Sequence, residues 1–289
     1  MIRKAKQKIA EAREKKAIRL DLRHYELTDL ETQVPEISNL TDLEELYLSG
    51  NQLTNVYGLA NLPALKILDL QNNQLTDVSG LSSLNALTGL SLQNNQLIDI
   101  SPLSSLSSLA ILGLSNNKLT EVSAISSLTN LTQVHLFNNK LTDVSGLSNL
   151  TALITLLLNG NQITDVSLLS SLNALITLDL RNNELKDVSP ISKLNKLSVL
   201  RLDNNQVTDV SALTGLSALQ EFYYHTNMKY DNNYWSFQNP INSCVALRLQ
   251  NGGDIVRGCS RFTKATFVAA VKTKYNSHHP YIKWANRVK

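Results

Sequence analysis

The feature that most constrains the fold is an asparagine that recurs every 22 residues, eight times in succession. The same apolar frame, L-x-x-L-x-L-x-x-N-x-L-x-x-V-x-x-L-x-x-L, surrounds each copy, and its slots hold only Leu, Ile or Val from 43 to 218. One copy alone cannot bury its leucines, whereas stacked copies bury them against their neighbours. The pattern therefore predicts a solenoid. The repeated residues are Asn51, Asn73, Asn95, Asn117, Asn139, Asn161, Asn183 and Asn205.

Two apolar periods within each copy predict its local structure. The L-x-L segment alternates with period two, which is typical of a short strand with one buried face. The later apolar residues come every third position, which favours a short 3₁₀ turn. Each copy is then one coil of an α/β solenoid, with a strand of a parallel sheet on one side and a tight turn on the other. The buried asparagine needs partners for its amide, and the backbone of the neighbouring coil can supply them as an asparagine ladder.

This frame resembles the leucine-rich repeat family. Within that family, the 22-residue length and the D-V/I-S-x-L segments, such as 99–103 and 187–191, resemble the internalin and phosphatase-regulator subclass. The resemblance implies a curved, right-handed horseshoe whose sheet of about ten strands lines a concave face. The start of the chain reads I-A-E-A-R-E-K-K-A-I-R-L-D-L at 9–22 and L-T-D-L at 27–30. This start also resembles cytoplasmic bacterial leucine-rich repeat proteins, including Roco-type GTPases, but G-x-x-x-x-G-K-[ST] occurs nowhere in the sequence.

The two ends depart from the frame and predict caps. Residues 1–16 place Ile2, Ala5, Ile9 and Ala12 at helical spacing, as expected for an amphipathic helix that covers the first coil. Residues 17–42 form an atypical first repeat. The eight regular repeats span 43–218, and 219–289 are interpreted as a last strand and a C-terminal cap or small appended domain. Within that region we expect a strand at 245–249 and a helix at about 262–275.

Charge is distributed unevenly along the chain. The net charge is +6 over 1–25, −11 over 26–227 and +8 over 228–289. Basic ends could bind nucleic acid or an acidic surface, although solvated caps are the simpler interpretation. No apolar run approaches the roughly 20 residues of a membrane helix, and no secretory signal is visible. Cys244 and Cys259 lack C-x-x-C spacing, and we expect free thiols in a cytoplasmic protein, with a disulfide in a secreted or surface protein as the alternative.

Candidate binding residues lie between and after the strand leucines, where side chains point away from the core. Small polar residues fill the middle of these two columns, but larger ones follow from 135 onward. Aromatic residues and arginine are typical of protein interface hot spots. We therefore predict a protein-binding surface on the concave face. Its residues are Tyr47, His135, Phe137, Leu157, Asp179, Arg181, Arg201, Asp203, Tyr223 and His225.

An acidic column follows the asparagines at a distance of four residues, as in Asp77, Asp99 and Asp187. A cation-binding stripe would need clustered ligands, so we interpret these acids as caps of the short turns. No metal site, cofactor or catalytic motif is expected, because neither H-E-x-x-H nor G-x-S-x-G occurs. The sequence predicts a monomeric, non-catalytic adaptor or regulatory scaffold that binds a protein partner. An internalin-like surface or secreted protein that contacts a host is the alternative.

Overall fold

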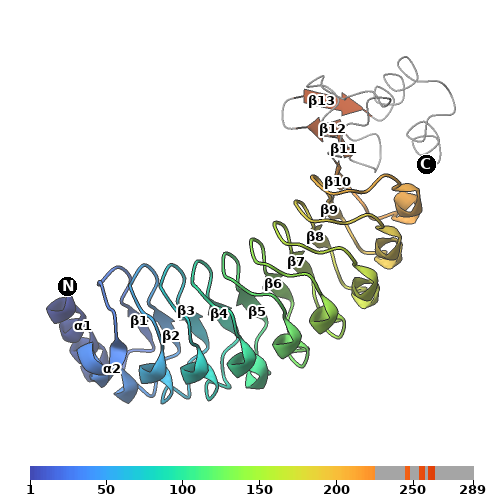
Figure 1. The fold of residues 1–289 in the computed structure, drawn as a ribbon. Helices are drawn as coiled ribbons and strands as arrows, with labels where there is room; N and C mark the ends of the chain where they lie inside the picture. Colours follow the sequence, from blue (N-terminus) through green and yellow to red (C-terminus); the bar gives the residue numbers. More distant parts are fainter. Residues whose placement is uncertain (225–244, 248–253, 258–259, 264–289) are drawn as a thin grey trace, which may run out of the picture. The chain divides into compact units, whose positions relative to one another are not determined.

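The computed structural model describes residues 1–224 and three short strands at 245–247, 254–257 and 260–263. The chain divides into two compact units. The first unit contains Met1–Leu141 and Ser145–Leu153, and the second contains Thr142–Val144 and Ile154–Lys289. In both units successive coils stack side by side, each with a strand on one side and a one-turn helix on another (Figure 1).

The first unit begins with helix α1 (Ile2–Glu14), which confirms the predicted N-terminal helix and buries Ala5, Ile9 and Ala12. Six strands follow in parallel register, each coil placing its strand beside the previous one. A four-residue helix, α2 (Leu30–Gln33), accounts for the irregular first repeat. The strands are β1 (Arg19–Asp21), β2 (Glu45–Tyr47), β3 (Ile67–Asp69), β4 (Gly89–Ser91), β5 (Ile111–Gly113) and β6 (Gln133–His135).

The second unit continues the same architecture with four parallel strands. They are β7 (Thr155–Leu157), β8 (Thr177–Asp179), β9 (Val199–Arg201) and β10 (Glu221–Tyr224). Strand β11 (Val245–Leu247) pairs antiparallel with β10, and β12 (Asp254–Arg257) pairs antiparallel with β13 (Ser260–Thr263). The helix expected from about 262 was therefore wrong at its first two residues, which belong to β13, and the rest of it lies outside the described residues.

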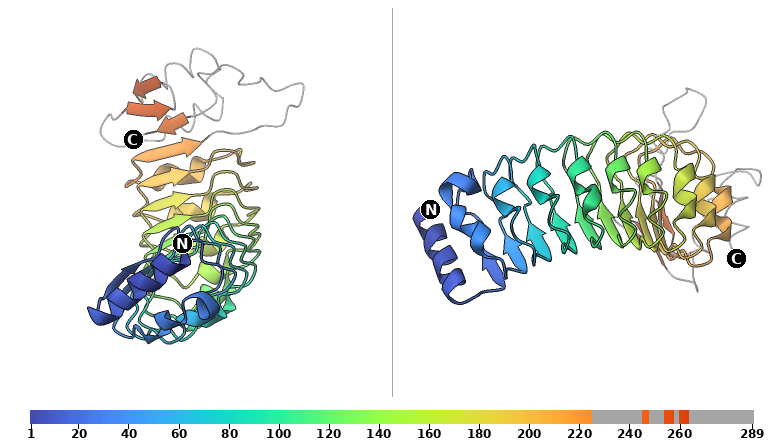
Figure 2. Two further views of the ribbon diagram at one scale, coloured as in Figure 1. Left: turned by 90° about the vertical axis from the view of Figure 1, so that its left-hand side faces the viewer. Right: turned by 90° about the horizontal axis from the view of Figure 1, so that it is seen from below.

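One-turn helices occupy a different side of each coil from the strands, and Figure 2 shows them in end-on and bottom views. Their 3₁₀ geometry confirms the interpretation of the every-third-residue pattern, because 3₁₀ helices have three residues per turn. They are η1 (Pro35–Asn39), η2 (Tyr57–Leu59), η3 (Ser79–Leu81), η4 (Ser101–Ser105), η5 (Ser123–Ile125), η6 (Ser145–Leu147), η7 (Ser167–Ser171), η8 (Ser189–Lys193) and η9 (Ser211–Gly215).

The core consists of the aliphatic residues of the repeat frame, nearly all of which are fully buried. The predicted asparagine ladder is confirmed among them. Asn73 donates from Nδ2 to the Leu48 carbonyl of the preceding coil at 3.1 Å and to Leu70 of its own coil at 3.0 Å. Its Oδ1 accepts from the Leu53 N–H at 3.0 Å. Each ladder amide thus supplies hydrogen-bond partners to backbone groups that the coil bend would otherwise bury without partners.

The residue before each ladder asparagine has a left-handed backbone conformation. Six of these positions hold asparagine with φ between 54° and 57°, and Gly50 and Gly160 hold the remaining two at 69° and 71°. Only glycine and asparagine adopt this left-handed region readily. The column of Asn and Gly beside the ladder is therefore a backbone requirement of the bend, visible in the sequence although not among its predictions.

Candidate binding surface on the sheet

Strand β10 adds Glu221 and Tyr223 to an outward surface, which we call the sheet face, on which each strand from β1 to β9 presents three side chains. They are the first and third residues of the strand and the residue two positions beyond it, because side chains alternate along a strand. Sequence reasoning identified the last two columns and missed the first, although period two also predicts it. The missed column is Arg19, Glu45, Ile67, Gly89, Ile111 and Gln133 in the first unit and Thr155, Thr177, Val199 and Glu221 in the second.

Tyr47 lies between two arginines on the sheet face of the first unit. The guanidinium carbons of Arg19 and Arg23 lie 4.7 and 5.6 Å from its ring centroid. Its hydroxyl donates to Glu45 at 2.9 Å, and this hydrogen bond raises the pKa of Tyr47. Two arginines and a glutamate thus hold the Tyr47 side chain in place at the N-terminal end of the sheet.

The Asp21–Arg23 pair anchors one of these arginines. Nη2 of Arg23 lies 2.6 Å from Oδ2 of Asp21, and Nε donates to Oδ1 at 3.0 Å. The hydrogen bond from Arg23 lowers the pKa of Asp21 to about 2. Both side chains remain accessible to solvent, so screening reduces what the pair contributes to stability.

His135 and Phe137 mark the C-terminal end of the sheet face in the first unit. Both side chains are only partly exposed, although the sequence placed them on the outward surface. Burial lowers the pKa of His135, because removal from water penalises the charged imidazole. This end of the face therefore combines an aromatic ring with an imidazole whose uncharged form is favoured by burial.

A buried carboxylate organises the sheet face of the second unit. The Asp179 side chain is 3% exposed. It accepts from Arg181 Nε at 2.9 Å and from Nη2 at 2.6 Å, while Arg201 Nη1 lies 3.9 Å away. The side chains of Arg181 and Arg201 remain 42% and 30% exposed. Asp179 thus positions the arginines rather than contacting solvent, and its hydrogen bond raises the pKa of Arg181.

Arg201 also lies over the neighbouring aromatic ring. Its guanidinium carbon is 5.3 Å from the ring centroid of Tyr223, within cation–π range. Tyr223 is half-buried, and this burial raises the pKa of its hydroxyl. Leu157 and Asp203 occupy the same face and are partly exposed. His225 lies outside the described residues, so its predicted place in the surface stays a prediction.

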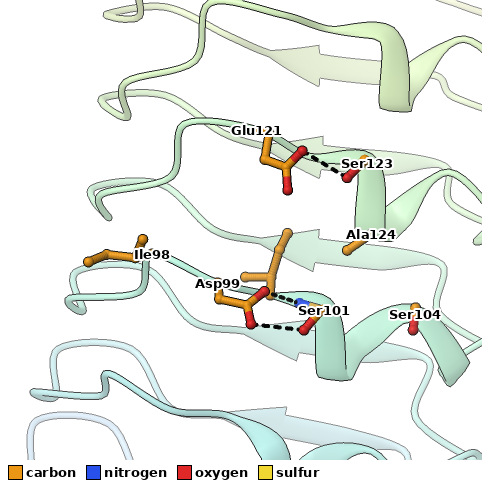
Figure 3. Close-up of a pocket in the computed structure, with 8 residues that line it drawn as sticks. Ile98, Asp99, Ser101, Ser104, Glu121, Ser123 and Ala124 are labelled. Carbon is orange, nitrogen blue, oxygen red and sulfur yellow. Dashed lines mark hydrogen bonds between the residues drawn. The ribbon is translucent and has the colours of Figure 1, made fainter.

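The acidic column caps the turns, as predicted. Oδ1 of Asp187 accepts from the Ser189 N–H at 2.8 Å and Oδ2 from its hydroxyl at 2.9 Å, which lowers the pKa of Asp187. A hollow of about 230 Å³ lies beside two of these acids, Asp99 and Glu121. Figure 3 shows the side chains that line it. Both carboxylates there accept from serines of their own turns. The hollow therefore consists of ordinary turn caps and the exposed Ile98.

The described residues form neither a metal-binding cluster nor a membrane-spanning helix. Within 1–224 and the three short strands, no group of three or more His, Cys, Asp or Glu could hold a metal ion. Within the same ranges, no helix has the length and apolar character needed to cross a bilayer. Cys244 and Cys259 both lie outside these ranges, so their redox state stays a prediction.

A family description of leucine-rich repeats in pairs of copies matches 41–83, 63–105, 107–149, 151–193 and 173–220. These ranges cover more than half of the chain and coincide with the stacked coils. A comparison with curated proteins found no match. The family match therefore agrees with the repeat frame and with the fold.

Solved structures provide closer comparisons. An internalin, inlF, from Listeria monocytogenes is 31% identical, with a TM-score of 0.59 over 70% of this chain. This chain spans 65% of that internalin's length. Internalin C2 from the same species is 33% identical, with a TM-score of 0.63, and the match covers 65% of this chain and 83% of that one. A plant peptide hormone receptor, RGFR1, in complex with RGF2 is 28% identical, with a TM-score of 0.58 over 66% of this chain and 34% of the receptor.

Proposed function

The chain belongs to the leucine-rich repeat family, and we propose that it is a non-catalytic module that binds a protein partner through its sheet face. Leucine-rich repeat proteins are generally protein-binding and typically non-catalytic. The proposal that a partner binds at the sheet face rests on the Asp179 network, which holds two partly exposed arginines beside a tyrosine.

This arrangement reduces the usual cost of binding through arginine. A flexible arginine loses side-chain freedom when it enters an interface. Here Asp179 already restrains Arg181 and the Tyr223 ring lies against Arg201, so less freedom remains to be lost. Arginine and tyrosine are also enriched among residues that dominate interface energies. We therefore assign the centre of the partner surface to Arg181, Arg201 and Tyr223.

The proposed cellular role is that of an adaptor or regulatory scaffold in the cytoplasm. An internalin-like protein at the cell surface or in the medium is the second candidate, and the two Listeria internalins at 31% and 33% identity support it. An oxidised Cys244–Cys259 pair in protein isolated from its native source would favour the second role. Two free thiols would favour the first.

Quantitative affinity purification tests the binding surface. The full chain is immobilised, and proteins captured from a lysate of the native source are compared between wild type and the double variant Arg201→Ala/Tyr223→Ala. Loss of a hot spot worth ~2 kcal/mol predicts that a partner's retention falls by about thirtyfold.

The control, Lys193→Ala, removes the same positive charge from an exposed residue of η8, on another side of the coil. We expect this variant to retain the partner at the wild-type level. Equal retention by the double variant would refute the proposed surface.

A further inference from the structure

Gln93 folds across the sheet face of the first unit onto the next strand. A Cβ atom placed on Gly113 would lie 2.1 Å from Gln93 Nε2 and 2.4 Å from Cδ, so the carboxamide occupies the space of a missing side chain. Gly113 does not have a left-handed φ, and its backbone therefore tolerates other residues. We call this space above Gly113, bordered by Ser91, Ser115 and His135, the notch.

Two polar atoms beside the notch are buried without hydrogen bonds. Ser115 is fully buried, and its Oγ has no partner among the described residues. The same is true of Gln93 Oε1. The N–H groups of Leu92 and Asn94, on either side of Gln93, donate to the carbonyls of Gly113 and Ser115 at 2.8 and 3.0 Å, so Gln93 runs directly alongside them. Buried polar groups normally have partners, and each one left without a partner disfavours this closed arrangement.

The surroundings of the notch are uncharged. Strands β4 to β6 and the residues two positions beyond them present only Gly, Ser, Gln, Ile, His and Phe on the sheet face. The one titratable member is His135, whose pKa is lowered by burial. A carboxylate or ammonium group entering here would lose its hydration without gaining a charged partner. The notch therefore favours a neutral polar group.

We propose that the notch receives the carboxamide of an Asn or Gln side chain from a partner polypeptide, which displaces the carboxamide of Gln93. The size and shape of the site support this ligand, because a carboxamide already fills it. A ligand amide that approaches without the Gln93 tether can donate from its nitrogen to Ser115 Oγ or accept from that hydroxyl. The displaced Gln93 regains water at Oε1. The proposal shares with the proposed function only the premise of a polypeptide ligand, and Arg181, Arg201 and Tyr223 play no part in it.

Nuclear magnetic resonance titration of the labelled full chain tests the notch. The probes are acetyl-Gly-Gln-Gly-amide and its charged counterpart, acetyl-Gly-Glu-Gly-amide. We expect the Gln peptide to shift the Ser115 backbone amide and the Gln93 side-chain NH₂ in a saturable manner. The Glu peptide should leave both signals unshifted beyond the response to salt. Because these signals report only on the first unit, the result is independent of whether the second unit binds its partner.

Three variants separate displacement from simple surface contact. Gln93→Ala opens the notch and should tighten binding of the Gln peptide by about tenfold. Gly113→Ala fills the notch with a methyl group and pushes the flexible Gln93 tip outward, so saturable binding should disappear. Gly89→Ala is the matched control. Its new Cβ would meet only the Cδ1 tip of Ile67, at 2.9 Å, and binding should equal that of wild type.

Three results would overturn the proposal. They are an equal response to both peptides, wild-type binding in Gly113→Ala, and the absence of a saturable shift with the Gln peptide in both wild type and Gln93→Ala. The dispersion of amide signals from the other coils verifies that each variant is folded.

Discussion

Replacement of Asn117 by alanine tests whether the asparagine ladder holds the coils together. Its Oδ1 accepts from the Leu97 N–H at 3.0 Å. Its Nδ2 donates to the Leu92 and Leu114 carbonyls at 3.0 and 2.9 Å. These three leucines are fully buried, and Asn117 itself is 8% exposed. Alanine therefore leaves the Leu97 N–H buried without this partner, and each carbonyl keeps only the hydrogen bond from a neighbouring ladder asparagine.

The magnitude follows from the groups left behind. An unpaired buried N–H costs ~1–3 kcal/mol, and the loss of one of the two asparagine hydrogen bonds at each carbonyl costs ~0.5–1.5 kcal/mol. We expect Asn117→Ala to lower the free energy of unfolding by about 4 kcal/mol, among the largest effects of a single substitution.

The assay is urea unfolding, complemented by hydrogen exchange because repeat arrays can open one region at a time. The Leu97 amide should lose most of its protection in Asn117→Ala. The matched control is Asn116→Gly, which keeps the positive φ of 55° and removes only a surface hydrogen bond from Asn138. It should cost less than ~1 kcal/mol. A loss below ~1 kcal/mol in Asn117→Ala, or an unchanged Leu97 exchange rate, would refute the ladder argument.

Three further predictions concern the bend and two titrating residues. Gly160→Ala should destabilise the chain by ~1–2 kcal/mol, measured by thermal unfolding, because φ at 71° strains any residue with a Cβ. Arg23→Met should raise the pKa of Asp21 from about 2 toward 3.8 in a carboxyl titration followed by nuclear magnetic resonance. Since the folded pKa is the lower one, the pair stabilises the protein above pH 3.8, and this stability, less than ~1 kcal/mol for an exposed pair, is lost as the pH falls toward 2. The imidazole of His135 should titrate below pH 6.5. The free energy of unfolding should decline as the pH falls below 6.5, because the unfolded chain takes up the imidazole proton at a higher pH than the folded chain does. A titration midpoint of His135 at or above 6.5 would contradict this.

The repeat frame predicted the fold because each structural requirement recurs in every coil. Period two at L-x-L, period three at the turn and the buried asparagine each correspond to one element of the coil, so eight copies reinforce one interpretation. The irregular parts have no such repetition. Helix α2 arises from an insertion in a single coil, and its N-cap, Asp29, was not recognised although it accepts from the Glu31 N–H.

The sequence predicted which side chains lie on the sheet face, but it did not predict how deeply each of them is buried. The alternation of strand residues placed Asp179 and Arg181 on the sheet face, as the structure shows. It could not show that Asp179 is buried beneath its arginines, because that depends on how long side chains fold across neighbouring strands. The same limit applies to Gln93, whose place above Gly113 depends on its side-chain torsions rather than on its column.

The most direct test of the central claim is photo-cross-linking from defined positions in the second unit. A benzoylphenylalanine residue is placed either at Tyr223 on the sheet face or at Lys193 in η8, and each chain is expressed and irradiated in its native host. Both positions are accessible to solvent, so they differ mainly in the side of the coil that they sample. The proposed function predicts a protein cross-link from position 223 and none from position 193. A protein cross-link from position 193 and none from position 223 would contradict it.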